Sequence, residues 1–309
     1  MRTGAGGRSA RHRRSSAAGV AFLALILIMS SSPGPVAAAA VPASVGTAGR
    51  PGARLTTGLV AAEHSGTFKD GGVIAHGAAR FLGSPTNLAL AAPVVGMAAT
   101  PGGGGYWLVG ADGGVLSYGD ARYFGGTAGL RLRAPIVALA PTWDGQGYWL
   151  VGADGSVYSF GDAVFYGPAR PMSLPEPIVG FARTPDGRGY WMVSSHGAVY
   201  SFGDARYYGA PGPQGVPVTS AVRTPDGRGY WILFSNGAIA SYGDAINYAS
   251  SLGQKDALDP ATTIFTTSDG VGYWVAAADG AVASYGAAPN DGSMLGFRLN
   301  GSIIAATGW

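Results

Sequence analysis

Short apolar segments alternate with glycine-rich turns along most of this chain, and they recur at a nearly fixed period. The clearest segment begins Gly-Tyr-Trp, and its tyrosines are Tyr106, Tyr148, Tyr190, Tyr230 and Tyr273. Their spacings are 42, 42, 40 and 43 residues. A period of this length is typical of structural units that bury their apolar faces only against neighbouring units. The pattern therefore predicts a repeat domain whose function belongs to a surface that the units share.

One repeat contains four apolar segments, each short enough to be a strand. They cover residues 94–99, 106–109, 115–118 and 122–125, and the second is apolar on both alternating faces, as in a strand buried on both sides. Asp112-Gly113 between the second and third segments is a tight hairpin signal. No stretch after the N-terminal leader has helical periodicity. Four strands in about 42 residues are typical of a β-propeller blade.

The number of repeats follows from the third segment, which occurs six times, beginning at Val73, Val115, Val157, Val199, Ile239 and Val282. The first copy is degenerate, because residues 64–69 lack the Tyr-Trp pair, and residues 301–307 resemble a lone first segment. We therefore predict an all-β fold over residues 58–309, a six-bladed β-propeller of four-stranded repeats. The C-terminal strand would close the ring and satisfy both terminal sheet edges. Two tandem β-trefoils and an open β-solenoid are the alternatives.

The first 40 residues have the pattern of a secretory signal peptide. A start with five arginines is followed by the mostly apolar run 17–29, by Ser-Ser-Ser-Pro-Gly-Pro and by alanines at 37–40. The apolar run is shorter than the roughly 20 residues of a membrane-spanning helix. Residues 41–57, rich in Ala, Pro, Gly and Thr, predict a flexible lead-in. We expect a secreted protein, extracellular or associated with the cell wall, with no membrane span after cleavage.

Charge and cysteine content narrow the possible functions. The chain has 20 Lys and Arg against 17 Asp and Glu, but five of the arginines lie in the leader and every acid follows it. The predicted mature chain is therefore slightly acidic, which is not the footprint of a nucleic-acid-binding protein. The chain has no cysteine, which excludes disulfides, thiolate metal sites and cysteine nucleophiles.

The repeat resembles one found in secreted actinobacterial proteins. The residues that carry the resemblance are Gly105-Tyr106-Trp107-Leu108-Val109, Asp112-Gly113-Gly114-Val115 and Tyr118-Gly119-Asp120-Ala121. The resemblance covers about residues 64–309 and implies a β-propeller-like array. Such arrays often accompany cell-wall hydrolases or peptidases on one chain, and no catalytic partner of that kind is recognised here. The family implies no agreed activity.

Almost every acidic residue has a place in the repeat. Three kinds of turn hold them: the hairpins (Asp70, Asp112, Asp154, Asp279), the turns after the first strand (Asp144, Asp186, Asp226, Asp269) and the Gly-Asp-Ala turns (Asp120, Asp162, Asp204, Asp244). Aspartate in such turns usually bonds to its own backbone two residues on. The recurring tryptophans are expected to pack between blades. The sequence therefore predicts no catalytic residue, no metal site and no cofactor.

The linkers between blades vary most, and binding residues tend to lie on loops held by a rigid scaffold. They supply Arg131, Arg133, Arg170 and Arg298, whose guanidinium forks suit carboxylates and hydroxyl pairs. Trp143 replaces the proline of a Thr-Pro-Asp-Gly turn and is a separate candidate on the opposite face. We expect a non-catalytic binding propeller at the cell envelope, whose partner is a polysaccharide, peptidoglycan or an envelope protein. A polysaccharide hydrolase or lyase on the same scaffold is the alternative.

Overall fold

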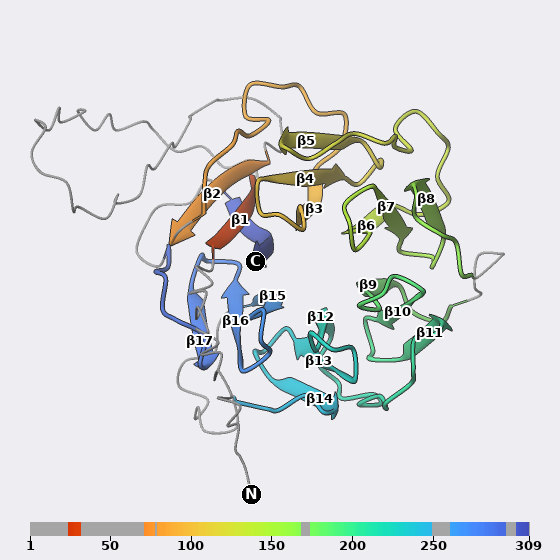
Figure 1. Cartoon of the computed structure of the whole chain (residues 1–309), viewed down its shortest axis with the longest axis vertical. Helices are drawn as coiled ribbons and strands as arrows, with labels where there is room; N and C mark the ends of the chain where they lie inside the picture. The colour runs from red at the N-terminus through yellow and green to blue at the C-terminus, as the bar shows by residue number, and fades with distance from the viewer. Residues whose placement is uncertain are drawn as a thin grey trace, which may run out of the picture.

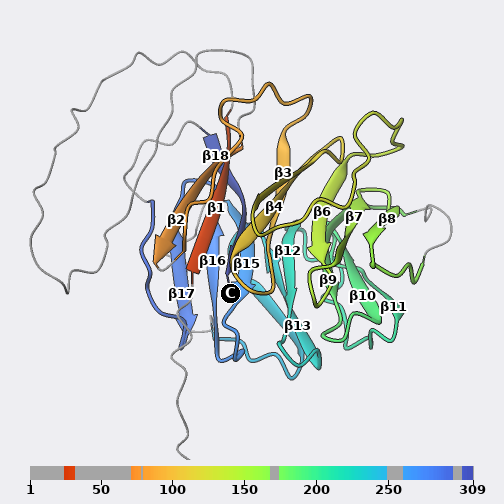
Figure 2. The ribbon, with the colours of Figure 1, turned by 45° about the horizontal axis from the view of Figure 1, so that its top comes forward.

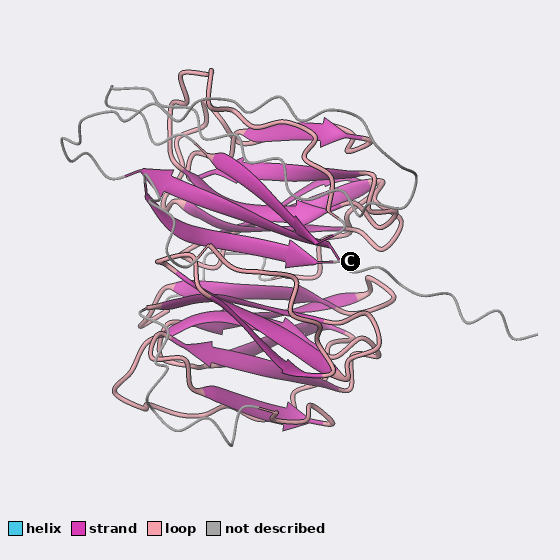
Figure 3. Cartoon of the chain, turned by 90° about the vertical axis from the view of Figure 1, so that its left-hand side faces the viewer, coloured by secondary structure: helices cyan, strands magenta, loops and turns pink. Residues whose placement is uncertain are grey.

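The computed structural model describes residues 24–31, 71–77, 79–167, 174–248, 260–294 and 301–308. Within these ranges the chain forms β-strands joined by turns and loops, and it has no helix (Figure 3). The strands form repeated antiparallel sheets of three strands each, arranged about a common centre as in a β-propeller (Figure 1). In these same ranges no helix is long and apolar enough to span a membrane.

Five sheets have the same chain order, from an inner strand through a middle strand to an outer strand. The inner strands are β3 (Val94–Ala99), β6 (Ile136–Pro141), β9 (Ile178–Arg183), β12 (Val218–Arg223) and β15 (Ala261–Thr266). The middle strands are β4 (Gly105–Gly110), β7 (Gly147–Gly152), β10 (Gly189–Ser194), β13 (Gly229–Phe234) and β16 (Gly272–Ala277). The outer strands are β5 (Val115–Gly119), β8 (Val157–Gly161), β11 (Val199–Gly203), β14 (Ile239–Gly243) and β17 (Val282–Gly286).

The sixth sheet joins the two ends of the described chain. Its order is β18 (Gly301–Gly308), β1 (Ala24–Ser31) and β2 (Gly72–Gly77), with antiparallel pairing on both sides of β1 (Figure 2). The predicted first-type strand at residues 301–307 is therefore confirmed, as is a strand at the third-segment position beginning near Val73. The predicted middle strand at residues 64–69 lies outside the described residues. Its place in the sheet order is taken by Ala24–Ser31, a continuous apolar run from the predicted leader.

The middle strands form the core, as their apolar pattern on both faces predicts. All six residues of β4 are buried, and the same holds for β7, β10, β13 and β16. The tryptophan of one repeat lies against the tyrosine of the next: the Trp107 and Tyr148 ring centroids are 5.9 Å apart, and those of Trp149 and Tyr190 are 6.1 Å apart. The prediction that these tryptophans pack between repeats is confirmed.

The predicted fourth strand of each repeat is wrong. Residues 122–125 follow the outer strand but join no sheet, and we call this stretch and its equivalents the outer segments. The backbone groups of an outer segment bond to side chains instead of to a neighbouring strand. Trp107 Nε1 donates to the Arg122 carbonyl at 2.8 Å, and Tyr148 Oη accepts from the Phe124 amide at 3.1 Å and donates to the Gly125 carbonyl at 2.5 Å. These bonds link each outer segment to its own repeat and to the next one.

Candidate functional site

The loops divide between two opposite ends of the sheets. One end, the turn face, carries the inner-to-middle turns and the Gly-Asp-Ala turns, which meet where the Asp120 amide donates to the Gly104 carbonyl at 3.1 Å. The other end, the linker face, carries the Asp-Gly hairpins and the linkers between repeats. They meet where the Thr127 amide donates to the Gly113 carbonyl at 3.0 Å. The linkers and the hairpins therefore share one face of the molecule.

A buried threonine organises each turn of the turn face. In the repeat that begins with β9, the Thr184 hydroxyl accepts from the Gly189 amide at 3.0 Å and donates to Asp186 Oδ1 at 2.9 Å. Four other repeats have a buried threonine with the same amide bond, namely Thr100, Thr142, Thr224 and Thr267. The turn face is therefore a rigid, repeated surface rather than a set of independent loops.

The turn aspartates bond to their own loops, as predicted. Asp186 Oδ1 accepts from the Arg188 amide at 3.2 Å, and Asp226 Oδ1 accepts from the Arg228 amide at 3.1 Å. The hairpins of the linker face follow the same rule, since Asp112 Oδ1 accepts from the Gly114 amide at 2.9 Å. These carboxylates hold turns together.

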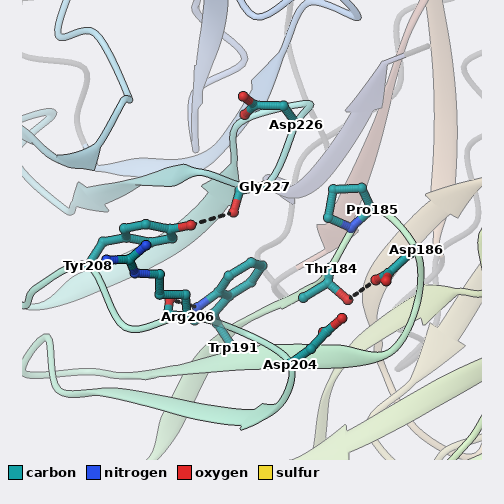
Figure 4. Close-up of a pocket in the computed structure, with 9 residues that line it drawn as sticks. All are labelled: Thr184, Pro185, Asp186, Trp191, Asp204, Arg206, Tyr208, Asp226 and Gly227. Carbon is teal, nitrogen blue, oxygen red and sulfur yellow. Dashed lines mark hydrogen bonds between the residues drawn. The ribbon is translucent and has the colours of Figure 1, made fainter.

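A cavity of about 320 Å³ opens on the turn face between two consecutive repeats. Its walls come from the turn, the middle strand, the Gly-Asp-Ala turn and the outer segment of one repeat, and from the turn of the next (Figure 4). The lining residues are Thr184, Pro185, Asp186, Trp191, Asp204, Arg206, Tyr208, Asp226 and Gly227. Two aromatic side chains meet five polar or charged ones there, so the cavity is an open, largely polar groove.

Hydrogen bonds fix the aromatic wall of this cavity. Tyr208 Oη donates to the Gly227 carbonyl at 3.0 Å, and Trp191 Nε1 donates to the Arg206 carbonyl at 2.8 Å. The Arg206 guanidinium carbon lies 5.8 Å from the centroid of the Tyr208 ring, within the range of a cation–π contact. The ring of Tyr208, the guanidinium group of Arg206 and the exposed carboxylate of Asp204 thus share one wall.

A second cavity of about 140 Å³ occupies the equivalent position one repeat earlier. Its lining uses the same repeat positions, with Trp149 in place of Trp191 and Tyr166 in place of Tyr208. Two positions differ: Trp143, which is 62% exposed, stands where the larger cavity has Pro185, and Val164 stands where it has Arg206. The groove is therefore a property of the repeat, and its shape differs from one repeat to the next.

The carboxyls at the edge of the larger cavity differ in proton affinity. Burial raises the pKa of Asp204, and the neighbouring Asp186 carboxylate raises it further. Burial acts on Asp186 in the same direction, but hydrogen bonds from Thr184 and the Arg188 amide outweigh it and lower its pKa. Asp226 also has a lowered pKa, chiefly because of the Arg228 amide. In the described part of the chain no three His, Cys, Asp or Glu residues are grouped to hold a metal ion.

The predicted binding residues do not gather in one place. Trp143 lies on the turn face and lines the smaller cavity. Arg131 and Arg133 are exposed in the linker between β5 and β6, on the opposite face. Arg170 and Arg298 lie outside the described residues. Neither of the two cavities involves these linker arginines, so their role stays a prediction.

Two features of the turn face escaped the sequence reasoning. The first is the set of cavity-lining side chains from the outer segments, Arg206 and Tyr208 above all, because those segments were expected to be strands. The second is a row of exposed aromatic residues at one outer-segment position, Phe81, Tyr123, Phe165 and Tyr207. The sequence shows that they share one position in the repeat. It does not show that they are exposed, because that follows from the outer segments not forming strands.

The sequence has no match in the comparisons with known proteins, and the fold has a distant one. No protein-family model matches the sequence. No curated protein matches it either. Among solved structures, the chain is similar to the β-propeller domain of Cps50 (Swd1) from Myceliophteria thermophila, with 10% sequence identity and a TM-score of 0.44. The similarity covers 70% of this chain and 73% of that one. The β-propeller-like arrangement therefore rests on the repeated three-stranded antiparallel sheets about a common centre.

Proposed function

We propose that this chain is a non-catalytic binding propeller of the cell envelope, and that its ligand is a polysaccharide or peptidoglycan. The observation that carries the proposal is the groove that recurs between successive repeats on the turn face, with a threonine, a tryptophan, a tyrosine and two aspartates in the same positions of both cavities. Such a row suits a polymer, because a chain of sugar units offers apolar ring faces and hydroxyl groups again and again. Aromatic side chains contact the former, while carboxylates and guanidinium groups bond to the latter.

For the whole molecule we propose six blades closed by the C-terminal strand. Neighbouring inner strands contact each other in the order β3, β6, β9, β12 and β15, and β18 contacts both β15 and β3. Buried Ile303 packs with Phe265 and Trp274 of the last repeat, while Ile304 packs against the cluster of Val94 and Met97. A strand that packs against both repeats in this way, and pairs with β1, would complete the ring.

We also propose that the protein is exported and acts outside the cell, as its leader and its resemblance to secreted actinobacterial repeat proteins suggest. Peptide mass spectrometry of the protein from culture medium and cell walls tests this, and we expect an N-terminus near residue 41. A chain recovered with residues 24–31 intact would contradict cleavage. It would leave β1 in its place between β18 and β2, whereas cleavage removes β1 and makes the predicted strand at residues 64–69 the remaining candidate for the middle of the sixth blade.

A hydrolase or lyase is the second candidate, because Asp186 and Asp204 form a carboxyl pair with opposite pKa shifts beside a cavity. Two observations weaken it. The same hydrogen-bonded pair recurs as Asp144 with Asp162, and Asp186 is held by its own turn. Release of reducing ends from wall polysaccharide by the native protein, abolished by Asp204→Asn, would favour the enzyme.

Cosedimentation with purified cell walls tests the binding function. Trp143→Ala in the full chain should weaken wall binding about tenfold, as expected for an aromatic anchor residue. Leu130→Ala is the matched control, since both side chains are 62% exposed and Leu130 lies on the linker face. Unchanged binding in Trp143→Ala, together with loss in an Arg131→Ala/Arg133→Ala variant, would move the site to the linker face. No binding by the wild-type chain to walls or isolated glycans would reject the envelope ligand, and a protein partner would then be the remaining hypothesis.

A further inference from the structure

Two arginines occupy the same position at the turn-face ends of neighbouring inner strands. Arg183 ends β9 and Arg223 ends β12, and these two strands contact each other. Each arginine directly precedes the buried threonine of its turn. Both side chains are partly buried. The pair therefore places two positive charges side by side at the inner edge of the turn face, next to the larger cavity, whose wall includes Thr184.

Neither guanidinium forms a short-range pair with a carboxylate, although the charges of Asp144 and Asp186 partly offset the effect of burial by raising the pKa of Arg183, and that of Asp226 does the same for the pKa of Arg223. Arg183 Nη1 donates to the carbonyls of Thr184 and Pro185, at 3.0 and 2.9 Å. Arg223 Nη1 does the same with Thr224 and Pro225, at 2.8 and 2.7 Å. No carboxylate in the described part of the chain lies within ion-pair distance of either. The remaining guanidinium nitrogens of both residues bond to no described residue, so each fork keeps donors to spare.

The nearby aspartates are engaged elsewhere. Asp186 and Asp226 accept bonds from their own turns and also lie 3.8 and 3.7 Å from the exposed Arg188 and Arg228. Burial lowers the pKa of Arg183 and lowers that of Arg223 to about 10, and the charge of Arg183 lowers the latter further. Both remain cations at neutral pH. Their charge is thus partly desolvated and mutually repulsive, a cost that a bound anion would relieve.

The turn itself does not need these arginines. The same inner-strand position holds Ala99 in the first of these turns and Pro141 in the second. In both turns the threonine hydroxyl accepts from the glycine amide at 3.0 Å, the same distance as in the turn of Thr184. The turn therefore forms without the Nη1 bonds, and they do not explain why two partly buried cations lie next to each other.

We propose that Arg183 and Arg223 together bind an oxyanion, the carboxylate of an acidic sugar or a phosphate group. Guanidinium forks match both groups, because two parallel N–H donors fit two oxygen atoms. The proposal deepens the proposed function, since it makes the glycan of the turn face an acidic one. The anion site is nevertheless testable with small probes, whether or not the grooves bind a polymer.

The test is thermal unfolding of the full chain in increasing inorganic phosphate or glucuronate, at constant ionic strength set with chloride. A bound anion should raise the midpoint in a saturable way. Arg183→Gln/Arg223→Gln should abolish the saturable rise. Arg188→Gln/Arg228→Gln, which removes two exposed arginines with acidic partners, should retain it. A response to glucuronate alone identifies a carboxylate ligand, and a response to phosphate alone identifies a phosphate ligand.

Two results would overturn the proposal: no saturable stabilisation of the wild-type chain by either anion, or the same stabilisation in Arg183→Gln/Arg223→Gln. Should that double variant fail to fold, Arg223→Gln alone should weaken the preferred anion at least tenfold, and unchanged affinity would count against the site. Trp143→Ala separates this proposal from groove binding. It should lose wall binding yet keep the anion response, whereas failure of the anion site leaves the wall assay of Trp143 unaffected.

Discussion

At the scale of single residues, the buried threonine is the part of the turn face that tolerates least change. Thr184 is only 4% exposed, and its hydroxyl satisfies the buried Gly189 amide. Thr184→Val keeps the shape and removes the acceptor, so this amide loses its partner. We expect a loss of about 1–3 kcal/mol in the free energy of unfolding, measured by denaturant titration of the full chain.

A strand threonine provides the control for this measurement. Thr219 lies in β12, and its hydroxyl makes only a 3.5 Å contact with the Leu233 carbonyl. Thr219→Val should therefore change stability by less than about 0.5 kcal/mol. Equal effects of the two substitutions would show that the hydroxyl of Thr184 does not hold the turn.

The core tyrosines make stability depend on alkaline pH. Burial raises the pKa of Tyr106 and Tyr230 to about 12, from an ordinary value of 10.0. The folded chain then holds protons that the unfolded chain releases, so the stabilisation is complete below pH 10 and is lost as pH rises toward about 12. Arg183 and Arg223 act in the opposite sense, but six tyrosines with raised pKa outnumber them.

Unfolding midpoints measured between pH 10 and 12, together with tyrosinate absorbance, check this expectation. The midpoint should fall across that window, and much of the absorbance should appear only on unfolding. A flat stability profile with free titration near the ordinary pKa would mean that water reaches the hydroxyl groups of the core.

The sequence predicts single-residue contacts best at positions that recur from one repeat to the next. The turn and hairpin positions of Asp112, Asp186 and Asp226 predicted bonds to their own backbone, and those bonds are present. The sequence did not single out Arg183 and Arg223, because they become neighbours only when β9 and β12, about 40 residues apart in the chain, lie side by side. Sequence spacing alone contains no information on which charges lack a partner.

At the scale of elements, the apolar pattern predicted the inner, middle and outer strands of the repeat and failed for the outer segment. The expected strands at residues 94–99, 106–109 and 115–118 correspond to β3, β4 and β5. The expected strand at 122–125 has the same aromatic character. However, its backbone bonds to the side chains of Trp107 and Tyr148, and this long-range competition with a ladder is invisible in a local pattern.

At the scale of the whole molecule, the proposed closure of the ring depends on β18, which contacts both β3 and β15. Ile303 of β18 is fully buried in the cluster of Phe265 and Trp274, and β18 also contacts β3. The period in the sequence predicted a strand at residues 301–307, because they resemble the first segment of a repeat, and the structure has β18 there. It gave no hint that the strand beside β18 would be Ala24–Ser31.

Removal of residues 300–309 should therefore open the array. The deletion exposes a sheet edge and the apolar cluster beneath Ile303, and we expect a much lower unfolding temperature together with aggregation, measured by calorimetry and light scattering. Ile303→Ala is the graded version and should cost about 2–5 kcal/mol, or on the order of 10 °C. Ser302→Ala, at an exposed position of the same strand, is the control. The deletion removes the contacts of β18 with both β15 and β3. An unchanged unfolding temperature would therefore exclude closure by this strand.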